Sequence, residues 1–318
     1  MRVLVTGSGG FIASYVIPRL RDRGDDVSGI DLHPPAGMPY SSPIDITSWG
    51  ELTQRLGLEK FDRVLHLAAI ASPRDCEGDP ARAFDVNVRG TYNVLRLAAQ
   101  CDAKVIFASS AHVYGIPPAW APTPERAPRK PQDPYTVTKI LGEELCARFA
   151  ESYQVPYVSL RLYNGYGPGQ PLGYFIPDTI KQAREHGRIT VRGARVTKDW
   201  LYITDMVNAI VAALTSPGFN GAVNIGSGQD TSLLDVAKII GARMGVPVAP
   251  AADLEAWAKD EQDRIARGFP PYHPESFMRA DVDLAKRMLP WEPKVSLEDG
   301  LHSTISAAVE ERRVAASV

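Results

Sequence analysis

The sequence predicts an α/β fold, in which a doubly wound parallel sheet is joined to a smaller C-terminal domain. Strand and helix patterns alternate through the first half of the chain, which favours parallel strands covered on both faces. The chain opens on an apolar, β-branched strand pattern that meets a glycine cluster at once. After residue 165 the expected elements become shorter and more irregular. We therefore expect one domain over 1–165 and a substrate domain over 166–318, with part of 195–228 a candidate to return to the first sheet.

The composition limits the classes of partner. With 318 residues the chain can bury a large core, and its net charge of -2 gives no sign of nucleic acid or of an anionic membrane as partners. The scattered cysteines lack CxxC spacing, which predicts reduced thiols and no metal site at Cys76, Cys101 or Cys146. Met1 leads directly into a strand, and no apolar run is long enough to span a membrane. The expected location is the cytoplasm.

The stretch from Arg2 to Ala13 has the order of a dinucleotide-binding unit, which is strand, tight turn and helix. Gly7 and Gly10 would let the backbone approach a pyrophosphate, and such a turn favours residues that accept positive φ. A helix beginning near Gly10 or Phe11 would point free N–H groups at that anion. The first domain is thus predicted to be of Rossmann type. The spacing Gly7-x-x-Gly10-x-x-Ala13 differs from GxGxxG, and an ordinary strand-to-helix turn is the alternative interpretation.

The other elements are expected in order along the chain. In the first domain, strands are predicted at 26–31, 44–46, 63–67, 104–108 and 157–162, and helices at 11–20, 48–56, 80–100 and 135–153. The prolines of 116–134 predict an irregular surface loop. In the second domain, strands are predicted at 200–203 and 222–225, and helices at 204–214, 232–244 and 297–312. A loose polar stretch covers 253–273.

Asp31 ends the second predicted strand, about twenty residues after the glycine turn. A carboxylate there accepts hydrogen bonds from ribose hydroxyls and repels a 2′-phosphate, which favours NAD over NADP. His33 works against that preference, because a partly cationic imidazole tolerates phosphate. A strand-end turn residue is the alternative interpretation of Asp31. Asp45 and Ile46, at the next strand end, could contact adenine or belong to the cap of the following helix.

Tyr135 and Lys139 lie four residues apart at the start of a predicted helix, and hence on one face. Ser110 follows the buried strand that precedes this helix. A tyrosine base needs its pKa lowered by about three units, which requires about 4 kcal/mol of preferential phenolate stabilisation. A neighbouring ammonium and a cationic nicotinamide supply energy of that order at short range. Ser110 would share the proton on the same substrate oxygen. Three unrelated surface residues are the alternative.

Further motifs stand in a fixed order. The chain carries Thr6-Gly7-x-x-Gly10-Phe11-Ile12, Asn87-Val88-x-Gly90-Thr91, Ser109-Ser110-x-x-Val113-Tyr114-Gly115, Tyr135-x-x-x-Lys139, Arg161-x-x-Asn164-x-Tyr166-Gly167-Pro168-Gly169, Lys198-Asp199-Trp200, Asn224-Ile225-Gly226-Ser227-Gly228 and Leu297-Glu298-Asp299-Gly300-Leu301. Together they resemble the extended short-chain dehydrogenase/reductases, in particular the nucleotide-sugar epimerase/dehydratase group. The resemblance covers nearly the whole chain and is specific for the family, though not for one reaction.

The resemblance implies a role for each matching residue. Tyr135 would be the base, Lys139 its activator and the ligand of the nicotinamide ribose, and Ser110 the partner on the sugar oxygen. NAD would lie against Gly7, Gly10, Phe11, Ile12, Asp31, Asp45, Ile46, Leu67, Ala68, Ala69, Ala71, Asn87 and Tyr163. Asn164 would reach the substrate, and 166–200 would hold its nucleotide diphosphate. The helices at 80–100 and 135–153 would pair across a two-fold axis in a homodimer.

Three positions depart from the family pattern. Ala13 replaces a third glycine, which adds one methyl group at a helix–sheet contact. Ala111-His112 stands where sugar 4,6-dehydratases carry an Asp-Glu pair, so that reaction is not expected. Lys198 replaces an arginine that typically holds substrate phosphate, and it supplies the charge without the bidentate fork.

The histidines point to no hydrolase or metal site. No GxSxG elbow accompanies Ser110, and no histidine pair has a spacing such as HExxH. His66, within an apolar strand, is expected to be a satisfied core residue. His112 could face the sugar as a hydrogen-bonding or acid/base group, or it could fill space beside the loop.

The leading hypothesis is an NAD-dependent nucleotide-sugar 4-epimerase. Tyr135 would remove the C4 hydroxyl proton as the C4 hydride passes to NAD, and the keto sugar would turn and take the hydride back on its other face. The rivals are an NAD(P)-dependent reductase of a nucleotide-linked 4-keto sugar, a simple sugar or polyol dehydrogenase, and an NAD-binding regulatory protein without catalysis. The sugar, the nucleotide and the pathway are left open.

Overall fold

The chain folds around one large parallel sheet, seen in the computed structural model, which describes residues 1–57, 59–115, 122–217, 219–251 and 277–315. Within these residues, seven strands pair in the order β10-β6-β5-β4-β1-β2-β3, and every pair is parallel. The strands are β1 (Arg2–Thr6), β2 (Asp26–Asp31), β3 (Ser41–Pro43), β4 (Arg63–His66), β5 (Lys104–Ser110), β6 (Tyr157–Leu162) and β10 (Gly221–Ile225). The predicted α/β class and doubly wound sheet are confirmed.

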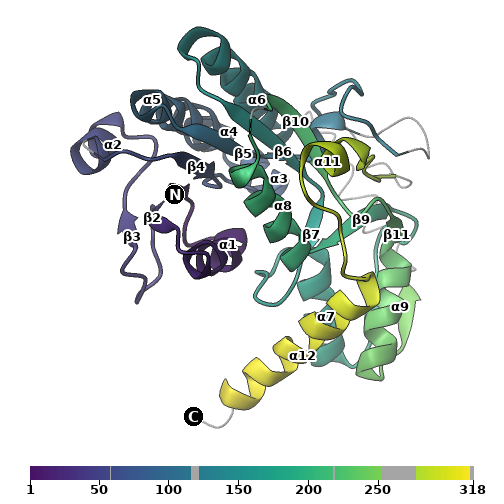
Figure 1. The fold of residues 1–318 in the computed structure, drawn as a ribbon. Helices are drawn as coiled ribbons and strands as arrows, with labels where there is room; N and C mark the ends of the chain where they lie inside the picture. Colours follow the sequence, from purple (N-terminus) through teal and green to yellow (C-terminus); the bar gives the residue numbers. More distant parts are fainter. Residues whose placement is uncertain (58, 116–121, 218, 252–276, 316–318) are drawn as a thin grey trace.

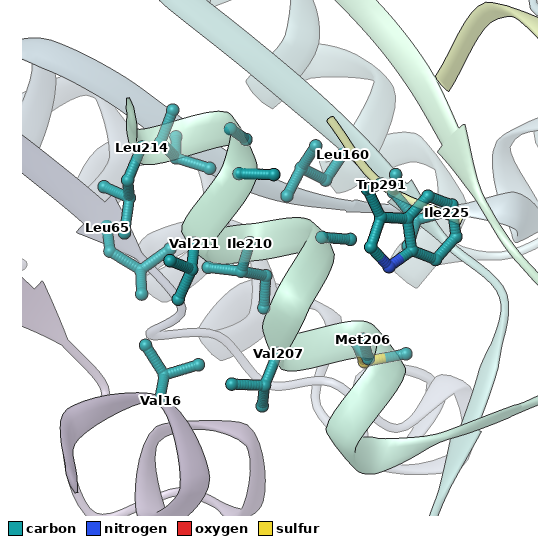
Figure 2. Close-up of a cluster of buried hydrophobic side chains, with 14 of the residues drawn as sticks. Val16, Leu65, Leu160, Met206, Val207, Ile210, Val211, Leu214, Ile225 and Trp291 are labelled. Carbon is teal, nitrogen blue, oxygen red and sulfur yellow. The ribbon is translucent and has the colours of Figure 1, made fainter. Parts of the chain in front are cut away.

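Helices cover both faces of this sheet because alternate residues of each strand are apolar on opposite sides. On one face lie α1 (Phe11–Asp22), α8 (Ile203–Thr215) and α11 (Asp283–Met288), packed on Val3, Val5, Leu65, Leu160 and Ile225. Figure 2 shows how α8 fills this layer, with Val207, Ile210 and Leu214 among strand side chains and Trp291 beside them. On the other face lie α2 (Trp49–Leu56), α5 (Thr91–Cys101) and α6 (Pro134–Tyr153), packed on Leu4, Val64, Val105 and Phe107.

The strand order changes direction between β1 and β4, because the chain fills one side of β1 before crossing to the other. In doubly wound sheets, ligands bind at the carboxyl ends of the strands beside such a switch point. The turns after β1, β4 and β5 all leave the sheet at this edge, so they bring the glycine cluster, the 67–71 stretch and Ser110 to one place.

The second half of the chain builds a smaller layer below the large sheet (Figure 1). It has a three-stranded sheet of β7 (Asn164–Tyr166), β9 (Thr197–Tyr202) and β11 (Asp230–Ser232), and a pair formed by β8 (Ile189–Val191) and β12 (Val248–Pro250). The helices α7 (Phe175–His186), α9 (Leu233–Met244) and α12 (Leu297–Ala315) pack on it around Ile180, Trp200, Ile240 and Leu301. From the 195–228 region, β10 joins the large sheet and β9 stays with the small one. The division at residue 165 stays a prediction.

Some elements differ from the sequence-based expectation. The helix predicted over 80–100 consists of α4 (Pro80–Phe84), a π-helical turn (Asp85–Gly90) and α5, and Ile46 packs where a side chain of Gly90 would lie. A short helix, α3 (Pro73–Gly78), precedes it, capped by Ser72, whose hydroxyl accepts the Asp75 N–H. The strand predicted at 44–46 lies instead at Ser41–Pro43, which is β3. Strands β7, β8, β11 and β12 and helices α3, α7 and α11 had not been predicted. The expected features at 116–121 and 253–273 lie outside the described residues.

Among the described residues, no helix has the length and apolar character to cross a membrane.

Candidate active site

The glycine turn after β1 makes a close backbone contact that excludes a side chain. Gly7 has φ +69°, and a Cβ there would lie 2.7 Å from the backbone nitrogen of Ala68. At Gly10 a Cβ would meet only the Gly7 carbonyl oxygen, at 3.2 Å. Helix α1 begins after Gly10 with no side-chain cap, and Ser14 donates its N–H back to Gly10 at 3.0 Å. The backbone N–H groups of Phe11, Ile12 and Ala13, in the first turn of α1, therefore have no acceptor within the helix, as anion binding at a helix N-terminus requires.

Buried polar side chains hold this turn against the next strand. Thr6 Oγ1 lies 2.7 Å from His66 Nδ1 and accepts the Ala68 N–H at 3.1 Å, while His66 Nε2 lies 2.9 Å from Thr91 Oγ1. Burial lowers the pKa of His66 to about 3, so the ring is neutral at physiological pH. His66 is thus the satisfied core residue that was predicted, and it ties β1, β4 and α5 together behind the turn.

Asp31 reaches back from the end of β2 to the glycine turn. Its carboxylate accepts the Gly9 N–H at 3.0 Å and the His33 N–H at 2.9 Å. Two amide donors hold the carboxylate beside the turn, at the position where a dinucleotide fold binds ribose hydroxyls. Pro35 lies over the same spot, because a Cβ on Gly9 would come within 2.8 Å of its ring.

The remaining predicted cofactor residues form the rim of the same edge. Asp45 accepts the Thr47 N–H at 2.8 Å in a turn before α2, whose cap is Ser48, and the Ile46 side chain packs on Gly90. In the 67–71 stretch, Leu67 donates its N–H to Thr6 O at 3.2 Å. Asn87 fixes that stretch, because its amide exchanges hydrogen bonds of 2.8 and 3.0 Å with the backbone of Ile70.

Tyr135, Lys139 and Ser110 come together where α6 passes the end of β5. Asp133 and Thr136 form a capping box that starts α6, so Tyr135 lies in its first turn. Lys139 is 5% exposed and donates to Ala108 O at 2.8 Å, with its Nζ 5.8 Å from the centre of the Tyr135 ring. Ser110 lies close enough to Tyr135 for its hydroxyl to oppose the rise in the pKa of the tyrosine. The arrangement can pass a proton between a tyrosine hydroxyl, a serine and a bound hydroxyl group.

Burial dominates the electrostatics of the pair in the protein alone. It raises the pKa of Tyr135 above its usual value, and the nearby hydroxyl of Ser110 acts in the opposite direction. It lowers the pKa of Lys139 to about 8, against the opposing effects of Cys76 and Glu143. The lowering of the tyrosine pKa that a base requires is therefore absent in the protein alone.

His112 lies beside this group, two residues after Ser110. The His112 ring packs edge-on to Tyr135 with the ring centres 6.1 Å apart, and the backbone N–H of His112 donates to Ser110 Oγ at 3.2 Å. Burial and, to a lesser extent, the charge of Lys198 lower the pKa of His112 to about 4, so the imidazole is neutral. Burial also lowers the pKa of Lys198. His112 therefore adjoins the Tyr135 group, and Lys198 lies within electrostatic range of His112.

Two predicted residues hold the second half of the site in place. Asn164 Nδ2 donates to Asp199 O at 3.0 Å, which joins β7 to β9. Tyr163 is buried with Ala111, Ala280 and Val282, on the Ser110 side of the edge.

Thr138 was not anticipated from the sequence, although it receives a hydrogen bond of 3.0 Å from Asn87 and so fixes α6 to the rim formed by the predicted cofactor residues. Its position three residues after Tyr135 was the available signal.

The chain matches the family described as "NAD dependent epimerase/dehydratase family" over residues 3–226. An uncharacterised UDP-glucose epimerase of Bacillus subtilis, YtcB, is 32% identical over 96% of this chain and 97% of its own length. UDP-glucuronic acid decarboxylase 1 of Xenopus tropicalis is 28% identical over 96% of this chain and 71% of its own length.

Solved structures agree with these relatives. The UDP-glucose 4-epimerase of Thermotoga maritima, determined with UDP-glucose, has a TM-score of 0.86 at 27% identity and covers 98% of this chain and 100% of its own. MoeE5, in complex with UDP-glucuronic acid and NAD, has a TM-score of 0.81 at 25% identity over 98% of this chain and 100% of its own. The turn after β1, with its uncapped helix and adjoining carboxylate, fits the cofactor of such enzymes. The chain belongs to the NAD-dependent epimerase/dehydratase family, within the extended short-chain dehydrogenase/reductases, and its cofactor is NAD.

Proposed function

We propose that the protein is a nucleotide-sugar 4-epimerase. The observation that carries the proposal is the convergence of Tyr135, Lys139 and Ser110 at the carboxyl edge of the sheet, the edge that also carries the glycine turn. The resemblance to the Thermotoga maritima 4-epimerase over the whole chain supports this reaction. The absence of an acid pair at Ala111 and His112 argues against 4,6-dehydration.

Tyr135 removes the proton of the C4 hydroxyl while Ser110 hydrogen-bonds the same oxygen. Lys139 stabilises the phenolate form of Tyr135 through its charge. The hydrogen bond from Lys139 to Ala108 O keeps the ammonium group in a fixed position. When the substrate returns as a ketone, Tyr135 gives the proton back to the C4 oxygen. NAD, when bound, supplies the hydride acceptor and donor. The keto sugar has to turn in the site between the two transfers, so the net redox change is zero.

The proposed binding residues divide between the two halves of the chain. Gly7, Gly10, Phe11 and Ile12 would hold the pyrophosphate, and the carboxylate of Asp31 would hold the adenosine ribose. Asp45 and Ile46 would adjoin the adenine, and the 67–71 stretch, Asn87 and Tyr163 would complete the cofactor site. On the substrate side, Lys198 would bind the diphosphate, and His112 and Asn164 would contact the sugar.

The test is conversion of UDP-glucose to UDP-galactose, and of other nucleotide sugars, by purified protein without added coenzyme. We expect an equilibrium mixture of C4 epimers at substoichiometric NAD, measured by anion-exchange chromatography. Strict dependence on stoichiometric NADH or NADPH would favour a 4-keto-sugar reductase. A pentose product with release of CO2 would assign the chain to decarboxylation.

Asp31→Asn should weaken NAD binding about 10- to 100-fold. The amide replaces a charged acceptor of ribose hydroxyls, and such hydrogen bonds contribute about 1.5–3 kcal/mol. NADP should be weakened less, because the repulsion of its 2′-phosphate is also removed. Calorimetric titration of both coenzymes measures the ratio. An unchanged ratio of NAD to NADP affinity would remove Asp31 from the ribose site.

A homodimer is proposed from the aromatic surface of α4, α5 and α6. Phe84, Tyr92 and Tyr153 are 40%, 43% and 63% exposed, and Phe149 contacts Tyr92 and Tyr153 with ring centres 5.7 and 4.9 Å apart. Exposed aromatic groups on adjacent helices are typical of an interface. Sedimentation equilibrium should give about twice the chain mass of 34.7 kDa, and a single-chain mass at micromolar concentration would contradict the proposal.

A further inference from the structure

Arg161 has no role in the proposed chemistry, although its charged side chain is almost completely buried. Its guanidinium holds both oxygens of Glu143: Nε donates to Oε1 at 2.8 Å and Nη2 donates to Oε2 at 2.7 Å. The third group, Nη1, donates to the Tyr114 hydroxyl and to Glu125 O, each at 2.8 Å. A bidentate pair fixes direction as well as distance, so Arg161 determines where the Glu143 carboxylate lies.

Glu143 belongs to the helix that carries the catalytic pair. Tyr135, Lys139 and Glu143 follow one another at intervals of four residues along α6, and all three are buried. Ser109, next to Ser110 on β5, donates to Glu143 Oε1 at 2.6 Å. Glu143 therefore fastens α6 to β5 and β6 about two turns from Tyr135.

The same hydrogen bonds reach the other side of the site. Tyr114 ends the 3-10 turn Ala111–Tyr114, which starts directly after Ser110, and its hydroxyl donates to Asn224 Oδ1 at 2.7 Å. Asn224, on β10, in turn donates to Thr123 O at 2.8 Å. The network thus fixes the helix that bears Tyr135 and the turn that follows Ser110 relative to each other. Buried polar networks with each partner satisfied are rigid.

We infer that Glu143 is a positioning residue, whose carboxylate, clamped by Arg161 and Ser109, sets the place of Tyr135 and Lys139 relative to Ser110. The inference rests on the proposed function only in taking these three residues as the ones that perform the chemistry. The charge of Glu143 has an electrostatic effect as well. Glu143 acts against the burial that lowers the pKa of Lys139 to about 8, so its charge favours the ammonium form.

The neighbouring residue Glu144 is a matched control. Arg129 bridges the two carboxylates, with Nη1 3.4 Å from Glu143 Oε2 and Nη2 2.5 Å from Glu144 Oε1. The Glu144 side chain is 45% exposed, and its ion pair is with Arg129. Arg129, Glu143 and Arg161 all line a cavity of about 400 Å³, so water can reach an amide placed at position 143.

Glu143→Gln should lower kcat about 100-fold with little change in KM, because a displacement of about 1 Å in a catalytic group costs that much. The alkaline limb of the pH–kcat profile should move to lower pH, because Lys139 loses a charge that favours its protonated form. Glu144→Gln should retain the kcat and the profile of the wild type. Equal kcat and equal alkaline limbs in the two variants would overturn the inference.

Two further variants separate geometry from charge and from folding. Glu143→Asp keeps the charge and withdraws the carboxylate by one methylene, so kcat should fall while the alkaline limb stays in place. A wild-type kcat in this variant would contradict positioning. If Glu143→Gln does not fold, Ser109→Ala, which removes one donor and keeps the ion pair, should still lower kcat about fivefold. A wild-type kcat for Ser109→Ala would then overturn the inference.

A substrate-free measurement distinguishes failure of this inference from failure of the proposed function. Protein labelled with 15N-lysine gives an Nζ resonance for Lys139, identified by its loss in Lys139→Met. Its titration midpoint should fall in Glu143→Gln and stay constant in Glu144→Gln, whichever reaction the protein performs. A constant midpoint in Glu143→Gln would refute the electrostatic part even if the protein proves to be a 4-epimerase.

Discussion

Tyr135→Phe should lower kcat by about 10²- to 10⁴-fold, the range for loss of a general acid–base group. The variant lacks only the tyrosine hydroxyl, and the ring keeps its buried contacts with Ile70, Cys76 and Ala83. NAD affinity and the free energy of unfolding should therefore change little. Steady-state kinetics with a nucleotide sugar, together with calorimetric titration of NAD, measure both effects.

Tyr153→Phe is the matched control on the same helix. Its side chain is 63% exposed and lies four turns or more from the Ser110 contact, so the loss of its hydroxyl should leave kcat unchanged. A Tyr135→Phe variant with wild-type kcat would show that another group handles the C4 proton. His112, whose ring adjoins Tyr135, would then be the next candidate.

Gly7→Ala should destabilise the protein by about 2–5 kcal/mol and abolish NAD binding. The positive φ costs an alanine about 1–2 kcal/mol, and forcing a methyl into a packed space adds about 1–3 kcal/mol. The atoms in its way belong to the backbone of Ala68, at 2.7 Å, and cannot rotate aside. Displacement of the Ala68 backbone would also move the 67–71 stretch away from the glycine turn. Urea unfolding and NAD titration measure the two losses.

Gly24→Ala is the control that separates the cost of a positive φ from the cost of the contact with Ala68. Gly24 has φ +84°, similar to that of Gly7, but within the described residues a Cβ there would meet no atom within 4 Å. The control should lose only the conformational part, about 1–2 kcal/mol, and keep NAD binding. Equal losses in both variants would mean that the contact with Ala68 does not limit the turn.

The sequence was sufficient for the parts of the fold that depend on local patterns. Strand β1, the glycine turn and helix α1 were predicted because apolar periodicity and glycine spacing are local signals. The positions of Tyr135 and Lys139 on one face of α6 follow from helical geometry alone. Topological rules then bring the ends of β1 and β5 to one edge, which places Ser110 near the glycine turn.

The sequence was insufficient where distant contacts decide the structure. The π-helical turn at Asp85–Gly90 and the packing of Ile46 on Gly90 were not predicted, because no local pattern reveals a contact between residues so far apart in the chain. The strands β7 and β11 are only three residues long, and they exist because β9 lies between them. The bidentate hydrogen bonds between Arg161 and Glu143 join residues on separate elements, so neither residue alone indicates that the pair exists.

The pKa shifts at the site could not be predicted from local sequence patterns either, because the burial of a side chain depends on the complete fold. The charge of Lys139 was predicted to lower the pKa of Tyr135. In the protein alone, burial raises the pKa of Tyr135 and lowers that of Lys139 instead. Under the proposed mechanism, the positive charge of bound NAD would supply the stabilisation that the phenolate of Tyr135 needs.

The fate of the hydrogen on C4 tests the central claim most directly. A nucleotide sugar carrying deuterium at C4 is incubated with the NAD-loaded protein in ordinary water, and both epimers are analysed by NMR and mass spectrometry. Removal and return of the same hydrogen at one site predicts that deuterium remains at C4 in substrate and product alike. Loss of deuterium from C4 during epimer formation, or appearance of the product only with a consumed external reductant, would contradict a 4-epimerase built on Tyr135, Lys139 and Ser110.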